Sequence, residues 1–596
     1  RYCPGHDLSI DVIAYVAQRF LPLINDTTNE NDFVELEASV SPTSTPDTER
    51  KLVEMNFNIE RSLVKNRSCY DILDNYTKLV MYLMNVAITE SNTSPSRGSD
   101  IYQPYSFRTK DLNITRLPMA KFIPTWDEDE PKGSNLLRRI ARWLVNQNFW
   151  DFNDCLVPFN SFEEAIQWRE KMFSALPVPN VVYENMSSDK AMTQLAFAGC
   201  ACHYTHRIEK QSLSVCVCGI PGEQDLSDAV YVNDMTGLST FRVREPFERY
   251  GAAAYFDKDY QIIAIYWSHK SRLVRKGEPL WEHVKYVWRS TFFAYITIRD
   301  HLIATHLIES NAFVSASRKH LPVDHRLRKF IKPFTYHTVS VNDQAAKSLV
   351  NERGLVHRIW AFDYDEFLRV CDYISMNYNF CLSSEYISET MTPEKNHKSD
   401  EEWDKIYPIY HDHKNFSAII ENYVENFFRI NYDFHGEMDD SDKLPEDPYL
   451  TEFIGEICKQ LGIAGITSTQ CLIRVISKLI SAGTGIHEHV GQISDYMIDP
   501  RFIGAKLQQG KEMQNIQTYS QILVLSVITG LRMPGLLEDW SHLIDHDNFY
   551  EENLENYRNF KQQLIDLSME IDRRNKIRNY PFESFNPKFM ECSTSV

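Results

Sequence analysis

Residues 281–307 read WEHVKYVWRSTFFAYITIRDHLIATHL, a stretch with neither proline nor glycine, which favours a long helix. His301 and His306 lie five residues apart in this stretch. A helix with a π-bulge can turn an i, i+5 pair toward one metal ion. A histidine on an apolar helical face is also commonly a hydrogen-bonded core residue. The spacing by itself leaves both interpretations open.

A second pair of histidines lies in residues 481–496, SAGTGIHEHVGQISDY. His487 and His489 are two residues apart, and such positions on a regular α-helix point about 200° away from each other. One metal ion therefore cannot be bound by both side chains unless the helix is locally distorted. This stretch predicts part of a metal site, and the remaining ligands have to come from elsewhere in the chain.

The composition is that of a large, acidic globular protein. The chain has 596 residues, a formal net charge of −19, and 43% hydrophobic residues. The length predicts two or more domains or one very large domain. The acidic balance argues against nucleic acid or an anionic membrane surface as the main partner. No apolar run reaches the roughly 18 residues that a transmembrane helix needs.

The residue pattern changes along the chain and predicts a mainly α fold with a small β portion. Residues 1–135 are polar and largely irregular, and we expect them to pack on a main helical domain at 136–596. Residues 198–268 contain the strand-like runs SLSVCVCGI, STFRV and YQIIAIYWS. Helical patterns follow, among them SEYISETM at 384–391 and EENLENYRNFKQQLIDLSMEIDRRN at 551–575.

The twelve cysteines fit either a reducing or an oxidising compartment. The motifs CAC at 200–202 and CVC at 216–218 look like a four-thiolate metal site. On a strand, however, C-x-C places both side chains on one face, and a hairpin would set the two pairs opposite each other. We therefore expect disulfides or buried thiols there instead of zinc. We also expect a disulfide partner for Cys3, which the sequence does not identify.

N-x-S/T motifs suggest a secreted glycoprotein. Seven such motifs occur, and five of them precede residue 120 in polar surroundings that suit a protein surface. The chain begins with Arg1, which a cleaved signal peptide would explain, as would trimming of the chain. We expect secretion, with glycosylation at Asn25, Asn66, Asn75, Asn92, Asn113, Asn185 and Asn415.

Four segments, in order along the chain, resemble landmarks of the lipoxygenase family. Residues 281–307 resemble its long iron-binding helix, and LPVDHRLRKFIKPFTYHTVSVNDQAAKSLVNERGLV resembles the segment that leads into its arched helix. GTGIHEHVGQISDY resembles the second iron-binding helix, and EIDRRNKIRNYPFESFNPKFMECSTSV resembles the last helix and C-terminal tail. The resemblance covers about 281–596, and more weakly 185–280. It implies one large helical domain with a small β portion. The N-terminal region lacks evenly spaced strands, so we do not expect the family's separate N-terminal β-sandwich.

The resemblance also implies a cofactor and a substrate. Lipoxygenases bind one non-haem iron through three histidines from two central helices, a variable fourth group and the C-terminal carboxylate. The iron takes a hydrogen atom from a polyunsaturated fatty acid, and oxygen then adds. Such chemistry needs a redox metal with an open position, held by imidazole and carboxylate, and an elongated apolar cavity.

Matched residue by residue from Trp281, the resemblance places the first iron histidine at Ile296 and the second at His301; His306 then matches a family histidine that is not usually a ligand. Matched from the HVGQ motif, it places the variable ligand at His489 and the third histidine at Gly485, or at His487 after a two-residue deletion. The terminal carboxylate is that of Val596. The expected site is therefore vestigial, with His301, His487, His489 and Val596 as its remaining ligands and the ligands at Ile296 and Gly485 lost.

This register predicts a secreted lipoxygenase-like protein without catalytic iron, which keeps its scaffold to bind a fatty acid or other hydrophobic molecule, or for a structural or interaction role. The alternative is an active lipoxygenase that oxygenates polyunsaturated fatty acids. Its ligands would be His301, His306, His487 or His489, and Val596, in a shifted register. A binding protein for a pigment or a partner protein is a third possibility. The sequence does not fix the oligomeric state.

Overall fold

The computed structural model divides the chain into two compact units. One comprises residues 1–98, 124–155 and 159–177, of which only 161–163 are described. The other comprises 99–123, 156–158 and 178–596 and contains all the other described residues. These are 102–104, 118–120, 188–208, 226–345 and, with gaps within 346–354, 381–385, 433–442, 497–503 and 512–533, the chain up to 595. The predicted boundary at residues 135 and 136 lies outside the described residues.

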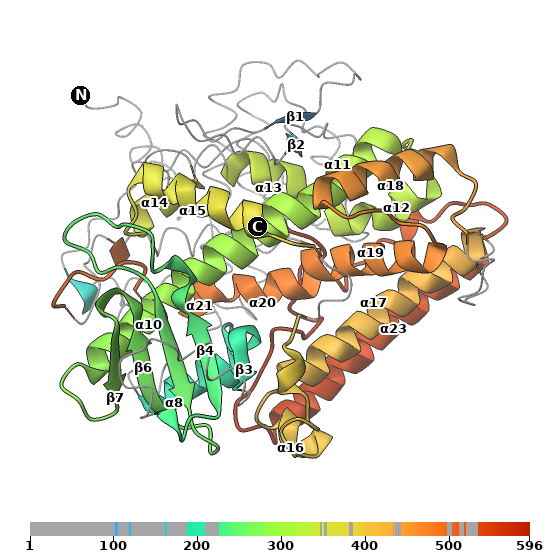
Figure 1. Ribbon diagram of the computed structural model, residues 1–596. Helices are drawn as coiled ribbons and strands as arrows, with labels where there is room; N and C mark the ends of the chain where they lie inside the picture. Colours follow the sequence, from blue (N-terminus) through green and yellow to red (C-terminus); the bar gives the residue numbers. More distant parts are fainter. Residues whose placement is uncertain are drawn as a thin grey trace, which may run out of the picture. The chain divides into compact units, whose positions relative to one another are not determined.

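The larger unit is mostly helical, as predicted, and two long helices, each containing a π-helical segment, lie at its centre (Figure 1). The first runs without a break through α10 (Trp281–Tyr295), the π-helical segment η8 (Ile296–Ser310) and α11 (Asn311–His320). Residues 284–294 in it are all buried, so protein surrounds every side of this part of the helix. A helix that is apolar on several sides has to lie inside the protein, so the sequence of residues 281–307 decides which helix is central.

The second central helix also contains a π-helical turn. It consists of α19 (Thr469–Ser481), the π-helical segment η12 (Ala482–Ile486), α20 (His487–Gly491) and α21 (Ile493–Tyr496). Segment η12 and helix α20 both pack against η8. The two histidine-bearing stretches of the sequence are therefore brought together. No described helix is both long and apolar enough to cross a bilayer.

The small β portion is an antiparallel sheet of five strands in sequential order. Its strands are β3 (Thr205–Arg207), β4 (Tyr231–Met235), β5 (Ala252–Phe256), β6 (Ile262–Trp267) and β7 (Arg272–Arg275). Every residue of β5 is buried, and α10 packs against β4 to β7. Helix α8 (Asp189–Ala198) precedes the sheet, and a separate two-stranded pair joins β1 (Tyr102–Pro104) to β2 (Pro118–Ala120).

Three local predictions differ from the structure. The run STFRV, at 239–243, is irregular instead of a strand, and of SEYISETM only the 3₁₀ turn η11 (Glu389–Met391) is helical among its described residues. The CAC motif is not on a strand, because the chain turns there from α8 into the 3₁₀ helix η4 (Cys202–Tyr204). Cys200 and Cys202 are buried, and no disulfide joins any of the described cysteines. Cys3, Cys216 and Cys218 lie outside the described residues.

Several shorter helices connect these elements. They are α12 (Arg326–Ile331), η9 (Lys332–Thr335), α13 (Thr338–Gln344), α14 (Leu355–Ile359), α15 (Tyr364–Asn377), α16 (Asp400–Asp404) and α18 (Pro448–Leu461). Short 3₁₀ turns are η6 (Thr236–Leu238), η7 (Ser268–Lys270) and η13 (Ser541–Leu543). Helix α18 packs against α11, and α13 packs against both α11 and η8.

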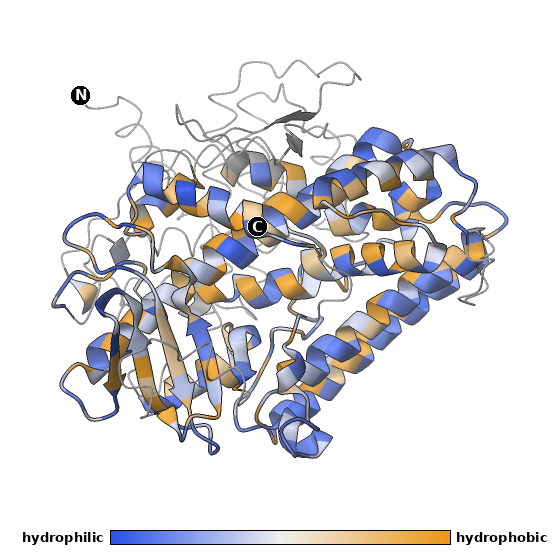
Figure 2. Ribbon diagram, in the orientation of Figure 1, coloured by the Kyte–Doolittle hydropathy of each residue, from blue (hydrophilic) through white to orange (hydrophobic). Residues whose placement is uncertain are grey.

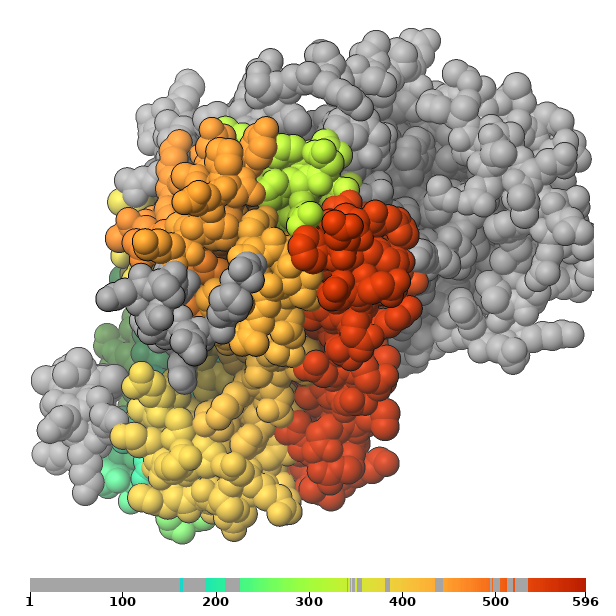
Figure 3. All heavy atoms as spheres, turned by 90° about the vertical axis from the view of Figure 1, so that its right-hand side faces the viewer, coloured from blue at the N-terminus to red at the C-terminus, as the bar shows by residue number. Residues whose placement is uncertain are grey.

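Two long helices, α17 (Ile409–Tyr432) and α23 (Tyr550–Asn575), lie side by side (Figures 1 and 3). The predicted helix at 551–575 is confirmed. Its buried apolar residues recur at alternating spacings of three and four, which gives one apolar face: Tyr557, Phe560, Leu564, Leu567 and Ile571. On the rest of this helix Figure 2 shows mainly hydrophilic residues, together with the exposed Ile565 and Met569.

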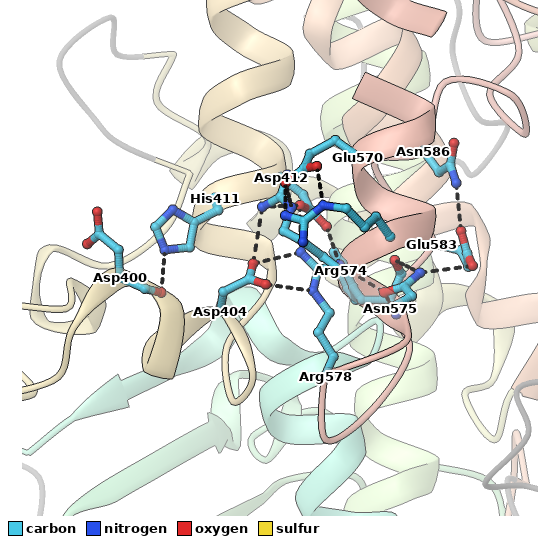
Figure 4. Close-up of polar contacts among 12 residues, drawn as sticks. Asp400, Asp404, His411, Asp412, Glu570, Arg574, Asn575, Arg578, Glu583 and Asn586 are labelled. Carbon is cyan, nitrogen blue, oxygen red and sulfur yellow. Dashed lines mark hydrogen bonds and ion pairs between the residues drawn. The ribbon is translucent and has the colours of Figure 1, made fainter. Parts of the chain in front are cut away.

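A buried ion network fixes the end of α23 against α16 and the start of α17 (Figure 4). The Arg578 guanidinium donates to Asp404 Oδ1 and Oδ2, at 2.7 and 3.0 Å, and to both carboxylate oxygens of Asp412, at 2.7 and 2.8 Å. Arg574 Nη1 lies 3.2 Å from each carboxylate. The side chains of Arg578 and Asp412 are fully inaccessible. The network holds the point from which the C-terminal tail departs.

Replacing Arg578 by methionine should lower the free energy of unfolding by about 3–5 kcal/mol, because it leaves two carboxylates in a site with little water. Chemical denaturation measures the loss. The matched control is Arg573→Met, since Arg573 pairs with Glu570 on the exposed surface, where such pairs contribute less than about 1 kcal/mol. Equal losses of unfolding free energy in the two variants would show that the buried network stabilises the protein no more than an exposed ion pair does.

Candidate metal centre

Three histidine side chains meet between the two central helices. His301 Nε2 lies 3.1 Å from His487 Nε2, His306 Nε2 lies 3.0 Å from His487 Nε2, and the remaining pair is 3.3 Å apart. His306 and His487 are buried, and His301 is partly exposed. Three imidazole nitrogens at these separations fit a common metal ion, whose bonds to imidazole are about 2.0–2.1 Å long. Within the described part of the chain, this is the one such group of potential ligands.

The π-helical segment η8 explains how His301 and His306 reach the same point. Its i→i+5 hydrogen bonding places residues five apart on one face, whereas an α-helix would turn them apart. Thr305 follows the same spacing, since its hydroxyl donates to the carbonyl of Asp300 at 2.7 Å. The structure thus pairs His301 with His306, whereas the expected register paired His301 with Ile296. Ile296 is fully buried in the apolar core.

On the second helix, the structure places His487, not Gly485, in the cluster. A Cβ atom added at Gly485 would lie 2.7 Å from the Phe416 ring and 2.9 Å from the Phe585 ring. Position 485 therefore faces closely packed aromatic rings and has no room for a ligand side chain. The observed arrangement agrees with the alternative match, in which a two-residue deletion places the third histidine at His487.

His489, which was expected as a remaining ligand, belongs to a different cluster, because positions 487 and 489 point to different sides of the helix. Its Nε2 lies 3.0 Å from His203 Nδ1, and His203 Nε2 lies 3.2 Å from Asp300 Oδ2. Burial raises the pKa of Asp300, but the Arg299 guanidinium and the hydrogen bonds from His203 and Tyr204 bring it below its usual value. Ionised Asp300 can only accept, so His203 donates through Nε2 and accepts from His489. These bonds hold the two central helices and the residues before β3 together.

The charge states of His301 and His306 suit metal binding. Burial lowers the pKa of His301 to about 3, with a further contribution from neighbouring His306. Burial also lowers the pKa of His306 to about 4. Both imidazoles are therefore neutral at physiological pH, which is the form that binds a metal ion.

Asn342, on α13, fixes the tautomer of His306. Its Nδ2 donates to the His306 carbonyl at 2.9 Å, which turns its Oδ1 toward His306 Nδ1, 3.0 Å away. His306 must then carry its proton on Nδ1, and its Nε2 lone pair points into the cluster. Such an outer hydrogen bond is typical of metal-binding histidines. Asn342 was missed by the sequence analysis, because no local pattern links residues 306 and 342.

The same face of α13 holds the C-terminal tail. Thr338 lies one turn before Asn342, and its hydroxyl is 2.9 Å from that of Thr594. The Ser593 hydroxyl donates to the Tyr336 carbonyl at 2.6 Å, and residues 593–595 are completely buried. The tail thus runs to the helix that also contacts His306. Val596 itself lies outside the described residues, so its predicted role as a ligand stays a prediction.

Sequence relatives include lipoxygenases, although no protein-family model matches the chain. Mouse arachidonate 12-lipoxygenase, 12R-type, is 24% identical over 339 residues, which cover 51% of this chain and 46% of the relative. The mouse polyunsaturated fatty acid (12S)/(13S)-lipoxygenase, epidermal-type, is 22% identical over 337 residues, covering 52% and 48%. The match spans about half the length of each curated relative.

Solved lipoxygenase structures share the fold. A lipoxygenase variant crystallised in complex with arachidonate matches with a TM-score of 0.63 and 15% identity, over 83% of this chain and 80% of that one. The lipoxygenase of Fusarium graminearum matches with a TM-score of 0.61 and 14% identity, over 80% and 96%. The chain is lipoxygenase-like. At these identities the structural likeness establishes the fold, and the chemistry of this lipoxygenase-like chain has to be argued from its own residues.

The predicted glycosylation sites are mostly beyond the described part of this lipoxygenase-like chain. Asn415 lies exposed on α17. The other six asparagines, Asn25, Asn66, Asn75, Asn92, Asn113 and Asn185, lie outside the described residues. Secretion and glycosylation therefore stay predictions.

Replacing His306 by alanine should remove bound metal, because it deletes one of three converging nitrogens. The matched control is His489→Gln, whose amide can still donate to His203 while the cluster stays intact. Metal content after loading with Fe²⁺ and desalting measures both. If the His306 variant keeps its metal and the His489 variant loses it, then His489 is a ligand and His306 is not.

Glu309, on η8, gives the protein a distinct pH dependence. Burial raises its pKa to about 7 from 4.5, although the Tyr378 hydroxyl donates to its carboxylate and Lys478 opposes the shift. Between these pH values the folded chain binds more protons than the unfolded chain. The contribution of Glu309 is therefore full below pH 4.5 and is lost as the pH rises through 7.

Glu309→Gln cannot ionise, so its free energy of unfolding should fall less than that of the wild type between pH 5 and 8. The difference should be on the order of 2–3 kcal/mol. Denaturant titrations at several pH values measure it. Glu552→Gln, at an exposed position on α23, is the control and should follow the wild type; an unchanged slope in the Glu309 variant would contradict the assignment.

Proposed function

We propose that this chain carries a lipoxygenase-type non-haem metal centre and oxygenates a polyunsaturated fatty acid. The observation that carries the proposal is the convergence of His301, His306 and His487 through their Nε2 atoms at 3.0–3.3 Å. Two core histidines that bind only each other form one hydrogen bond, in which one ring nitrogen donates and the other accepts. Three nitrogens that share a single point are better explained by a common ligand, which must be a cation when the imidazoles are neutral.

The chain's own groups are arranged for such a cation. Asn342 orients His306, the burial of His306 and His487 limits access of water, and the π-helical turn of η8 fixes two ligands on one rigid element. Iron bound there would supply the one-electron oxidation that removes a hydrogen atom from between two double bonds. The proposal that the Val596 carboxylate completes the site is supported by the position of Thr594 beside α13.

The substrate class is proposed from the relatives. The similar proteins are named as lipoxygenases of arachidonate and polyunsaturated fatty acids, and one similar structure contains arachidonate. A pocket lined by Phe330, Tyr423, Phe427, Trp540 and Tyr557 lies between α12, α17 and α23. None of the three histidines lines it, so it is not proposed as the site of the acyl chain.

Oxygen uptake tests the proposal. Protein loaded with Fe²⁺ should hold metal at near-stoichiometric amounts and consume oxygen with linoleate or arachidonate, with a conjugated diene forming in step. His306→Ala should lose both metal and activity, whereas His546→Ala, at an exposed position three residues after η13, should lose neither. Metal-loaded wild-type protein that consumes no oxygen with either fatty acid would overturn the catalytic proposal.

A second candidate is a secreted lipoxygenase-like protein that binds a hydrophobic ligand without catalysis. One observation favours it: the position one turn after His487 is Gly491, which offers no donor atom. This candidate predicts fatty-acid binding that is equal in wild-type protein and His306→Ala. Binding that needs the metal, together with turnover, would exclude it.

A further inference from the structure

The metal-binding helices contain three glycines, at 483, 485 and 491, and only the last one faces the histidine cluster. A Cβ atom at Gly485 would clash with aromatic rings, and one at Gly483 would approach the Ser310 hydroxyl and the Phe334 carbonyl. A Cβ atom at Gly491 would meet His301 Nε2 at 3.8 Å. Among the residues that the structure describes, and leaving aside its own helix backbone and chain neighbours, no other heavy atom would lie within 4 Å.

Position 491 also has the right relation to His487. Residues four apart on an α-helix lie on the same face, and two histidines at this spacing are a common way to bind one metal ion. Here α20 runs from His487 to Gly491, so the second position of such a pair is occupied by a residue without a side chain. His301 and Gly491 are both partly exposed, whereas His306 and His487 are buried, so solvent reaches the cluster region at the His301 and Gly491 side.

We propose that Gly491 leaves an open coordination position on the metal bound by His301, His306 and His487, and that a small exogenous donor, either water or a small anion, binds there. The inference rests on the proposed metal centre and goes beyond it. A metal that is held by three imidazoles has further positions to fill, and open positions in non-haem iron sites take exogenous ligands. At Gly491 the protein provides space where a side-chain ligand would otherwise stand.

The test uses the full-length protein loaded with Co²⁺, whose visible absorption reports its ligands, and sodium azide as the anion. Gly491→His supplies a ligand one turn after His487, and Gly491→Ala fills the space with a methyl group that cannot bind. Gly455→His is the matched control, because it adds the same side chain on α18, where a Cβ atom meets nothing within 4 Å. Competition with a chelator measures the metal affinity, and azide titration measures the open position.

Gly491→His should bind Co²⁺ at least about tenfold more tightly than the wild type, since even an outer partner of a metal ligand affects affinity by roughly 10–100-fold. It should also lose the spectral response to azide. Gly491→Ala and Gly455→His should keep the wild-type metal affinity. Wild-type Co²⁺ affinity together with an unchanged azide response in Gly491→His would overturn the proposal and leave the metal centre itself intact.

The two proposals fail in distinguishable ways. If the wild type binds no metal, both proposals are overturned, even where Gly491→His binds it. If the wild type binds Co²⁺ and responds to azide, while the Fe²⁺-loaded protein consumes no oxygen, the inference holds and the proposed catalytic function falls alone. If the wild type binds Co²⁺ and shows no response to azide, the position is closed and the inference fails alone.

Discussion

The i→i+5 hydrogen bonding of residues 296–310 is the constraint on which the site depends. A π-helix is rare because its bonding geometry is poor, and it persists where surrounding packing supports it. Here the support comes from all sides: α13, α15, α20 and η12 pack around this segment. As a result, the side chains of His301 and His306 become neighbours. Asp300, which directly precedes His301, instead forms a hydrogen bond with His203.

The second central helix meets this segment with an equivalent local distortion. The π-helical turn at 482–486 comes directly before His487, and its glycine-rich sequence allows the Phe416 and Phe585 rings to pack close to the backbone. His487 and His489 then serve different clusters. His487 directs Nε2 toward the Nε2 atoms of His301 and His306. His489 donates a hydrogen bond from Nε2 to His203. The hydrogen bonds from His489 to His203 and from His203 to Asp300 pair polar groups that lie buried between the two helices, where a low-dielectric interior penalises an unpaired charge.

The C-terminal tail connects the ion network around Arg578 with the helix that contacts the three-histidine cluster. Arg578 and its two carboxylate partners fix the end of α23, and the last described residues bind the turn before α13. Helix α13 in turn orients His306 through Asn342. Residues 593–595 of this tail are completely buried.

The sequence by itself determined the fold class, the central helix, the helix at 551–575 and the fact that His487 and His489 cannot serve one ion, because each of these follows from local periodicity or from a long resemblance. It also named His301 and His487, together with His489, which the structure places in a separate cluster with His203. Tertiary structure decided the rest. The pairing of His301 with His306 depends on whether a helix is α or π, which its neighbours settle. His203 and Asn342 are joined to their partners across long stretches of chain. The crowding at Gly485 and the space at Gly491 exist only once Phe416, Phe585 and His301 have been brought beside them.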